Sequence, residues 1–148
     1  MRVIFTYAIS TASPPATSTE ELCGDDDAFQ LTEVGGKSVL DVFLPARGSE
    51  VKVFDRGNHQ SSIAFVVTKL HASLSDARDF QMMHATKFPG VGVLKLENFT
   101  GGPSATQWTY IKGGFNDVRV KAIGATTVAT YSFTGGKPKQ TAIQPDPL

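Results

Sequence analysis

The chain has 148 residues, and its 14 basic and 14 acidic side chains give a formal net charge of zero. This length is typical of one domain, and the charge balance disfavours a protein whose general task is to bind nucleic acid or an anionic membrane. No apolar run reaches the roughly 20 residues that cross a bilayer. We therefore expect a single soluble domain over residues 1–148, with no membrane contact and no sequence-specific binding of nucleic acid.

The chain begins with a short apolar stretch that alternates as a strand does. Residues 1–10 contain one basic side chain, and Thr6 interrupts their apolar run, which is shorter than the apolar region of a typical signal peptide. The pattern predicts a strand and no export signal. The lone Cys23 cannot form an internal disulfide, which favours a reducing compartment.

Residues 11–27 are rich in Thr, Ser, Pro and Ala and end in three acids, so they are too polar to order by burying their own side chains. The sequence predicts an extended arm that orders against a second copy of the chain. Prolines predict a similar extended tail over residues 137–148. The residues assigned to the assembly arm are Pro14, Pro15, Leu22, Asp25, Asp26 and Asp27.

Between these ends, the chain alternates like a series of short strands separated by Gly and Pro. We expect turns at the Gly-Gly pairs of residues 35–36 and 113–114, and a hairpin turn at residues 55–58. The last three strands form a meander. The expected strands are residues 37–44, 50–54, 62–68, 91–96, 106–111, 116–122 and 127–133.

One helix is predicted, over residues 73–86. Ser73 can accept from the amide of Asp76 while the Asp76 carboxylate reaches back, as in a capping box. Apolar side chains then recur at every third position, and this face must be buried. Its partner is the sheet of the flanking strands, so we expect a mainly β fold: an antiparallel β-sandwich or partly closed barrel with one packed α-helix. The expected helix core is Leu74, Ala77, Phe80 and Met83.

No group of residues has the spacing of a catalytic or metal site. The three histidines form no helical i, i+4 pair, no second Cys joins them, and the acids of residues 25–27 do not follow a calcium-loop pattern. We expect no enzyme activity, no catalytic residues, no metal and no cofactor. A hydrolase would need two groups to converge from among His59, which is expected in the hairpin turn, and His71, His84, Asp25 and Cys23.

Trp108 and Tyr110 leave two interpretations open. Residues two apart on a strand share a face, so these rings could stack on a sugar if they are exposed, or could fill the core if they are buried. An exposed coplanar pair favours a carbohydrate-binding or adhesin-like β-sandwich module, whereas buried rings favour an assembly subunit.

Over residues 63–136, the order is a strand, a capped helix, a strand preceded by Pro-Gly, and a meander that ends in Gly-Gly. The residues that carry this pattern are 65–67, 72–77, 89–90 and 124–136. The pattern resembles the small β-sandwich-plus-helix domain of bacteriophage tail tube and distal tail proteins.

This resemblance implies a structural subunit of a virion, most simply a tail tube or tail-associated protein, built in the cytoplasm of a bacterial host. The family implies rings, commonly sixfold, in which sheets of neighbouring copies join edge to edge. Other virion proteins are the further partners it implies. Roles in the tail tube, tail tip, connector or capsid decoration stay open at this point.

Overall fold

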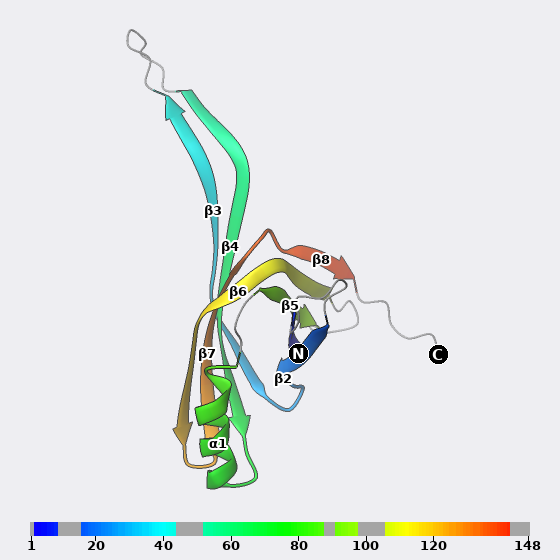
Figure 1. Cartoon of the computed structure of the whole chain (residues 1–148), viewed down its shortest axis with the longest axis vertical. Helices are drawn as coiled ribbons and strands as arrows, with labels where there is room; N and C mark the ends of the chain where they lie inside the picture. The colour runs from blue at the N-terminus through cyan, green and yellow to red at the C-terminus, as the bar shows by residue number, and fades with distance from the viewer. Residues whose placement is uncertain (1, 9–15, 44–51, 88–90, 98–105, 143–148) are drawn as a thin grey trace, which may run out of the picture.

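A computed structural model describes residues 2–8, 16–43, 52–87, 91–97 and 106–142. Within them the protein is mostly antiparallel β structure, with a single short helix and a sheet that is not closed (Figure 1). The predicted sandwich-like fold class is therefore confirmed. The elements in chain order are β1 (Arg2–Ala8), β2 (Thr17–Cys23), β3 (Ala28–Phe43), β4 (Lys52–Leu70), α1 (Leu74–His84), β5 (Gly92–Glu97), β6 (Thr106–Ile123), β7 (Thr126–Gly135) and β8 (Lys139–Ala142).

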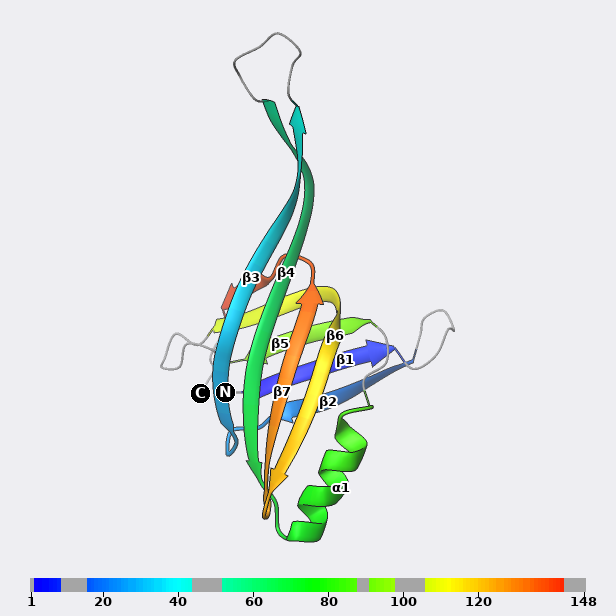
Figure 2. The ribbon, with the colours of Figure 1, turned by 90° about the vertical axis from the view of Figure 1, so that its left-hand side faces the viewer.

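The strands form two sheets that share β6. Sheet A has the order β2-β1-β5-β6-β8, and sheet B has the order β6-β7-β4-β3, with every neighbouring pair antiparallel. Figure 2 shows the strands of sheet A crossing behind those of sheet B at a steep angle. Orthogonal packing of this kind uses strands that bend from one sheet into the other, which is what β6 does.

β6 changes sheets at a bend beside Gly113. Lys112 has φ 51°, and a Cβ on Gly113 would lie 2.5 Å from both a ring carbon of Phe133 and the carbonyl oxygen of Thr134. Glycine is therefore needed for a close approach of the backbone and not for a turn. The turn predicted at this Gly-Gly pair is wrong, because the two strands expected on either side of it are halves of β6.

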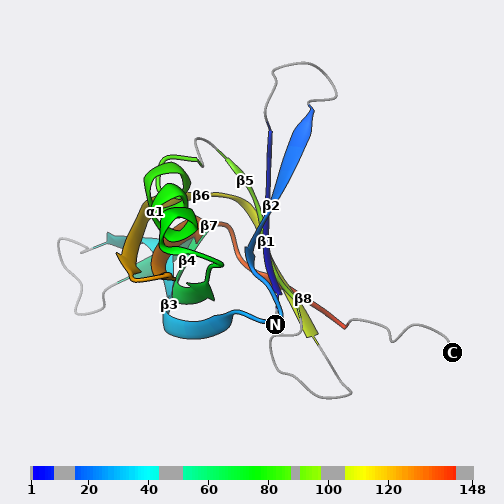
Figure 3. The same cartoon turned by 90° about the horizontal axis from the view of Figure 1, so that it is seen from below.

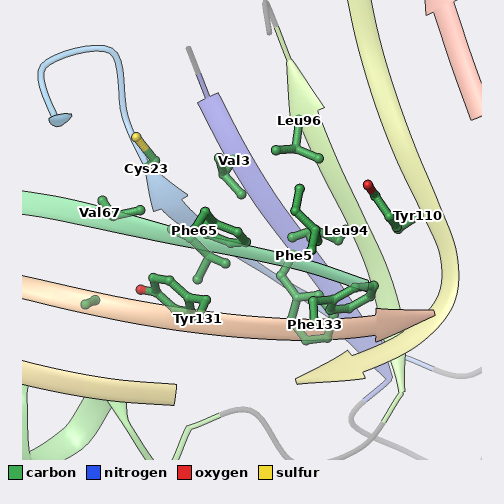
Figure 4. Close-up of a cluster of buried hydrophobic side chains, with 13 residues drawn as sticks. Val3, Phe5, Cys23, Phe65, Val67, Leu94, Leu96, Tyr110, Tyr131 and Phe133 are labelled. Carbon is green, nitrogen blue, oxygen red and sulfur yellow. The ribbon is translucent and has the colours of Figure 1, made fainter. Parts of the chain in front are cut away.

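The core fills the space between the two sheets (Figure 4). Phe5 of sheet A meets Phe115 and Phe133 edge-on, with ring centroids 4.9 Å and 6.1 Å apart. Phe65 of sheet B stacks on Tyr131 at 4.9 Å. Alternate positions of each strand thus supply the interior. Other fully buried side chains around these rings are Val3, Leu22, Cys23, Val67 and Leu94.

Helix α1 packs on β6 and β7 beside sheet A (Figure 3). As predicted, Ser73 caps its start, accepting from the Asp76 backbone N–H at 3.2 Å. The cap satisfies one of the amide groups that the first turn leaves unpaired. Sequence alone thus located the helix and its capping residue, although α1 begins one residue later and ends two residues earlier than the predicted range.

The expected burial of the helix face is wrong for Leu74, which is 46% exposed, and for Met83, which is 71% exposed. Ala77 is fully buried, Phe80 is half-buried, and the third inward residue is His84. Spacings of three and then four residues follow the helical period of about 3.6 more closely than a strict spacing of three.

β3 and β4 form a long hairpin that extends well beyond the rest of the sheet (Figures 1 and 2). The turn predicted at residues 55–58 is wrong, because these residues continue β4. Residues 35–36 likewise lie inside β3, opposite Ser61 and Ser62. Pairing along a whole strand outweighs the local turn preference of glycine. Residues 44–51, which join the two strands, lie outside the described residues.

The predicted arm is in part a core strand. β2 pairs with β1, and Leu22 and Cys23 at its end are fully buried. The strand is polar because it lies at the edge of sheet A, where only its last two residues reach the interior. The expectation that this segment orders only against a second copy is therefore wrong for β2. Pro14 and Pro15 lie outside the described residues.

The predicted tail also joins the sheet. β8 pairs with the first half of β6, from Thr106 opposite Ala142 to Thr109 opposite Lys139. The expectation of an extension is wrong for β8, which Pro138 precedes without removing any donor from its ladder. Residues 143–148 lie outside the described residues.

Candidate functional site

The acidic residues of the sequence-predicted arm close the turn between β2 and β3. Asp27 Oδ2 accepts from the Gly24 N–H at 2.9 Å, and the Asp27 N–H donates to the Gly24 carbonyl oxygen at 3.1 Å. Lys69 Nζ lies 3.5 Å from the same carboxylate oxygen, whereas Asp25 and Asp26 are exposed. Asp27 thus has a structural role. Among the described residues, no group of three or more acids, histidines and cysteines is arranged to hold a metal ion.

Two of the three histidines lie against Phe80 of α1, and we call this group the imidazole cluster. The Phe80 ring stacks on His84, with centroids 4.3 Å apart, and contacts His71 at 5.0 Å. Each imidazole reaches a hydroxyl of β7. His84 Nε2 lies 2.5 Å from the Tyr131 hydroxyl, and His71 Nε2 lies 2.7 Å from Thr127 Oγ1. The cluster therefore ties the helix and the residue that follows β4 to β7 of sheet B.

Burial sets the charge states in this region. It lowers the pKa of His84 to about 4, and Lys69 acts in the same direction. Burial also raises the pKa of Cys23 to about 11 and raises the pKa of Tyr131. At neutral pH the imidazole of His84 is uncharged, and the thiol and the phenol keep their protons. Cys23 therefore lacks the lowered pKa of an activated nucleophile.

The remaining groups of the hydrolase interpretation do not join the cluster. His59 lies in β4 opposite Ser38, ten positions before Lys69 and not in a turn as expected. Asp25 lies on the exposed turn between β2 and β3. His71 and His84 do come together, but each is hydrogen-bonded to a β7 hydroxyl beneath the helix, an arrangement that stabilises packing.

Trp108 and Tyr110 border an apolar cavity and do not form an exposed platform. Tyr110 is 4% exposed and meets Phe133 edge-on at 5.9 Å, and Trp108 is half-buried. The coplanar exposed pair that a sugar site requires is thus contradicted at these positions. The cavity has a volume of about 330 Å³ and is lined by Leu31, Val34, Ile63, Leu96, Trp108, Tyr110 and Pro138.

Sheet B ends on both sides in a strand edge that no other described strand pairs with. One is the outer edge of β3, and the other is the outer edge of residues 114–123 of β6, which pair with β7 alone (Figure 2). Free edges present backbone N–H and C=O groups to whatever lies beside them. Such edges can pair with a strand of another chain.

The turn between β6 and β7 determines which backbone N–H and C=O groups of β6 point away from β7, toward the outer edge of sheet B. Gly124 has φ 61°, as the first position of a type II′ turn requires, and the two-residue loop makes Ile123 and Thr126 a hydrogen-bonded pair. Counting back along β6 from Ile123, hydrogen-bonded and non-hydrogen-bonded positions alternate. Val120, three residues before Ile123, is therefore not hydrogen-bonded to β7 and directs its backbone N–H and C=O groups away from that strand. In agreement, the Val120 carbonyl oxygen accepts from Gln81 Nε2 at 3.1 Å.

The same alternation of hydrogen-bonded and non-hydrogen-bonded positions can be followed through β7 and β4 to β3. It shows which backbone N–H and C=O groups of β3 point away from β4. Glu33 lies opposite Ala64, and this pair is hydrogen-bonded within sheet B. The backbone groups of Val34 and Gly36 therefore point to the free edge. Outward-pointing backbone groups are thus assigned on both edges, at Val34 and Gly36 of β3 and at Val120 of β6, whose carbonyl oxygen accepts from Gln81.

A β-bulge shapes the side-chain pattern of the β3 edge. The register shifts between Leu31 and Glu33, so that Leu31 lies opposite Phe65 and Val34 lies opposite Ile63. The bulge places both apolar residues on the face toward sheet A, although they are three positions apart. Leu31 is 37% exposed and Val34 is 57% exposed, because the cavity beside them leaves this end of the sandwich incompletely covered. Alternation in the sequence gave no signal of this pair.

No protein-family model matches the chain, and no curated protein is significantly similar to it. Helix α1, with 11 residues, is too short to cross a membrane, and the described part of the chain holds no longer helix.

Proposed function

We propose that the chain is a structural subunit of a bacteriophage virion, of the tail tube or tail-associated type, and that identical copies assemble into rings. The observation that carries the proposal is the pair of free edges of sheet B. In the virion, other virion proteins would be its further partners. The proposal adds this geometry to the resemblance in the order of strands, capped helix and meander.

The strands at the two free edges of sheet B, β3 and β6, have directions that allow them to pair between copies. Sheet B has four antiparallel strands, so β3 and β6 run opposite ways. When copies stand side by side in the same orientation, β3 of one meets β6 of the next as an antiparallel pair. Such a contact uses two different surfaces, and its repetition closes a ring when the rotation allows. It also removes exposed edges, which are otherwise an aggregation hazard.

The long β3–β4 hairpin can make the contact with another copy that was predicted for residues 11–27. It projects past the sandwich as paired strands (Figure 1), so it needs less ordering than an unpaired arm when it meets a neighbour. We assign to it the contact with an adjacent copy or an adjacent ring.

The carbohydrate-binding alternative receives no support from the fold. Its rings would have to be exposed together, and Tyr110 is instead part of the interior. Stacking on a sugar needs an open aromatic face.

Sedimentation velocity and electron microscopy of the purified full chain test the proposal. We expect monomers to give way to one closed oligomer as concentration rises, and micrographs to show rings and, at high concentration, stacked rings. A monomer at every concentration, or a dimer that grows no further, would refute a ring-forming subunit. Because the copies are identical, no second protein is needed for the assay.

A further inference from the structure

The charges along the two free edges of sheet B match in antiparallel order. Glu33 and Lys37 lie four residues apart on β3, and Asp117 and Lys121 lie four residues apart on β6. All four side chains are exposed and lie on the face of sheet B away from sheet A. If Glu33 is placed opposite Lys121, antiparallel pairing places Lys37 opposite Asp117.

We infer that β3 of one copy pairs with β6 of the next copy in this register, with Val34 opposite Val120. The inference rests on the proposed ring-forming function and specifies the contact between its subunits. The partner is a second copy of this chain. Two intermolecular ion pairs, Glu33 with Lys121 and Lys37 with Asp117, fix the alignment.

Backbone geometry supports the register independently of charge. Val34 and Val120 both direct their N–H and C=O groups to the free edge, so placed opposite each other they form a hydrogen-bonded pair. A slip of one residue would turn every side chain to the wrong face. The charged residues then occupy the non-hydrogen-bonded positions, where side chains lie closer together.

If β3 shifts by two residues relative to β6 of the next copy, each side chain stays on the same face of the sheet, but the opposite charges no longer lie opposite one another. A slip one way places Lys37 opposite Arg119, which is a like-charge contact. A slip the other way places Glu33 opposite Arg119 and leaves Lys37 beyond the bulge between Phe115 and Asp117, with no acid opposite it. Only the inferred register satisfies both charges of β3. Within one copy Asp117 is 2.7 Å from Arg119, and a carboxylate can accept from two partners.

The contact also changes the neighbours of Val34 and Val120. Val34 gains an apolar neighbour, Val120, on the face toward sheet A. The Val120 carbonyl oxygen now accepts from Gln81, and in the ring the Val34 N–H of the neighbour takes that place. Ring formation thus exchanges a side-chain donor for a backbone donor.

The register gives a stagger suited to a closed sheet. Lys121 lies in line across sheet B with Val128, Thr68 and Ala28. In the inferred contact, Lys121 of the next copy lies opposite Glu33 of β3. Glu33 is five residues along β3 from Ala28, so each copy of four strands is displaced along the strand direction by about five residues, with the bulge residue counted. At about 3.4 Å per residue and about 4.8 Å per strand, the strands tilt by about 40°, within the range of closed barrels.

Charge reversal in two separate variants tests the register. Glu33→Lys and Lys121→Glu each set like charges opposite one another, and we expect each to raise the concentration needed for assembly by about tenfold or more. Mixed in equal amounts, the two variants should assemble like the unmodified chain, because each reversed site then faces its complement in alternating order. Lys37→Glu and Asp117→Lys provide a second such pair.

Lys139→Glu is the matched control, since Lys139 is an exposed lysine on β8, an edge strand of sheet A. It should assemble normally, and circular dichroism should show every variant folded. If the unmodified chain forms rings but the single variants do too, or the mixture does not recover, the register is wrong and the ring proposal stands. The register also fails if Lys139→Glu weakens assembly equally. If the unmodified chain never assembles, both proposals fail.

Discussion

Lowering the pH should weaken the packing of α1 on sheet B through His84. Burial holds the pKa of this imidazole at about 4 in the folded protein, against 6.5 for an exposed histidine. As pH falls below about 6.5, the unfolded chain takes up the proton first, so the free energy of unfolding decreases. The His84 contribution is fully present above that pH and is lost by about pH 4.

The size of the effect follows from the two pKa values. Their difference of about 2.5, at about 1.36 kcal/mol per unit, sets an upper bound near 3.4 kcal/mol. Relaxation around the charged imidazole and access of water reduce this to about 2 kcal/mol. Lys69 and Lys87 oppose the charge, whereas Glu20 favours it.

Urea unfolding at several pH values between about 7 and 4.5 measures the effect, with far-UV circular dichroism and Trp108 fluorescence as signals. The dilute chain is used, so that assembly does not contribute. His84→Gln keeps a side chain able to hydrogen-bond Tyr131 but removes the titration. Other acids titrate equally in both proteins, so the difference between them isolates His84. If the variant loses stability with falling pH as steeply as the unmodified chain, the argument from burial is refuted.

Phe80→Ala should lower the free energy of unfolding by about 2 kcal/mol, because it removes a ring that stacks on His84 and contacts His71; an unchanged urea midpoint would contradict this. Gly113→Ala should destabilise the fold by about 2 kcal/mol or more, because its Cβ would meet Phe133 and backbone at 2.5 Å, and a melting temperature equal to that of the unmodified chain would show that the bend can relax. Deleting residues 17–23 should abolish cooperative thermal unfolding, since β2 supplies two buried core residues; a cooperative, folded deletion variant would restore the arm interpretation. Adding a metal chelator should leave the melting temperature unchanged, and a fall would reveal a structural ion.

Several features of the fold were predictable because their causes are local. The Ser73 cap acts over three residues, so the start of α1 could be read from the sequence. Alternation in β7 and the β6–β7 turn at Gly124 were likewise readable, since side-chain direction and positive φ depend on neighbouring residues only. The class of fold follows from these elements together.

Features that depend on distant partners were not predictable. Polar β2 looked like an arm, because its strand pairing and the burial of Cys23 come from β1 and the core. Gly113 looked like a turn, because the close approach of Phe133 is a tertiary contact. The burial of His84 was not predicted, because the hydroxyl beside its ring belongs to Tyr131 of β7, which is distant in the sequence.

The sequence by itself determined which segments are strands or helix in much of the chain, and it supplied the charges of Glu33, Lys37, Asp117 and Lys121 without showing their relation. Only the tertiary structure made β3 and β6 the two edges of one four-stranded sheet. Edge position depends on which strands pair across long separations, and local propensity carries little information about that choice. The match between the two edges therefore became visible only once the sheet was assembled.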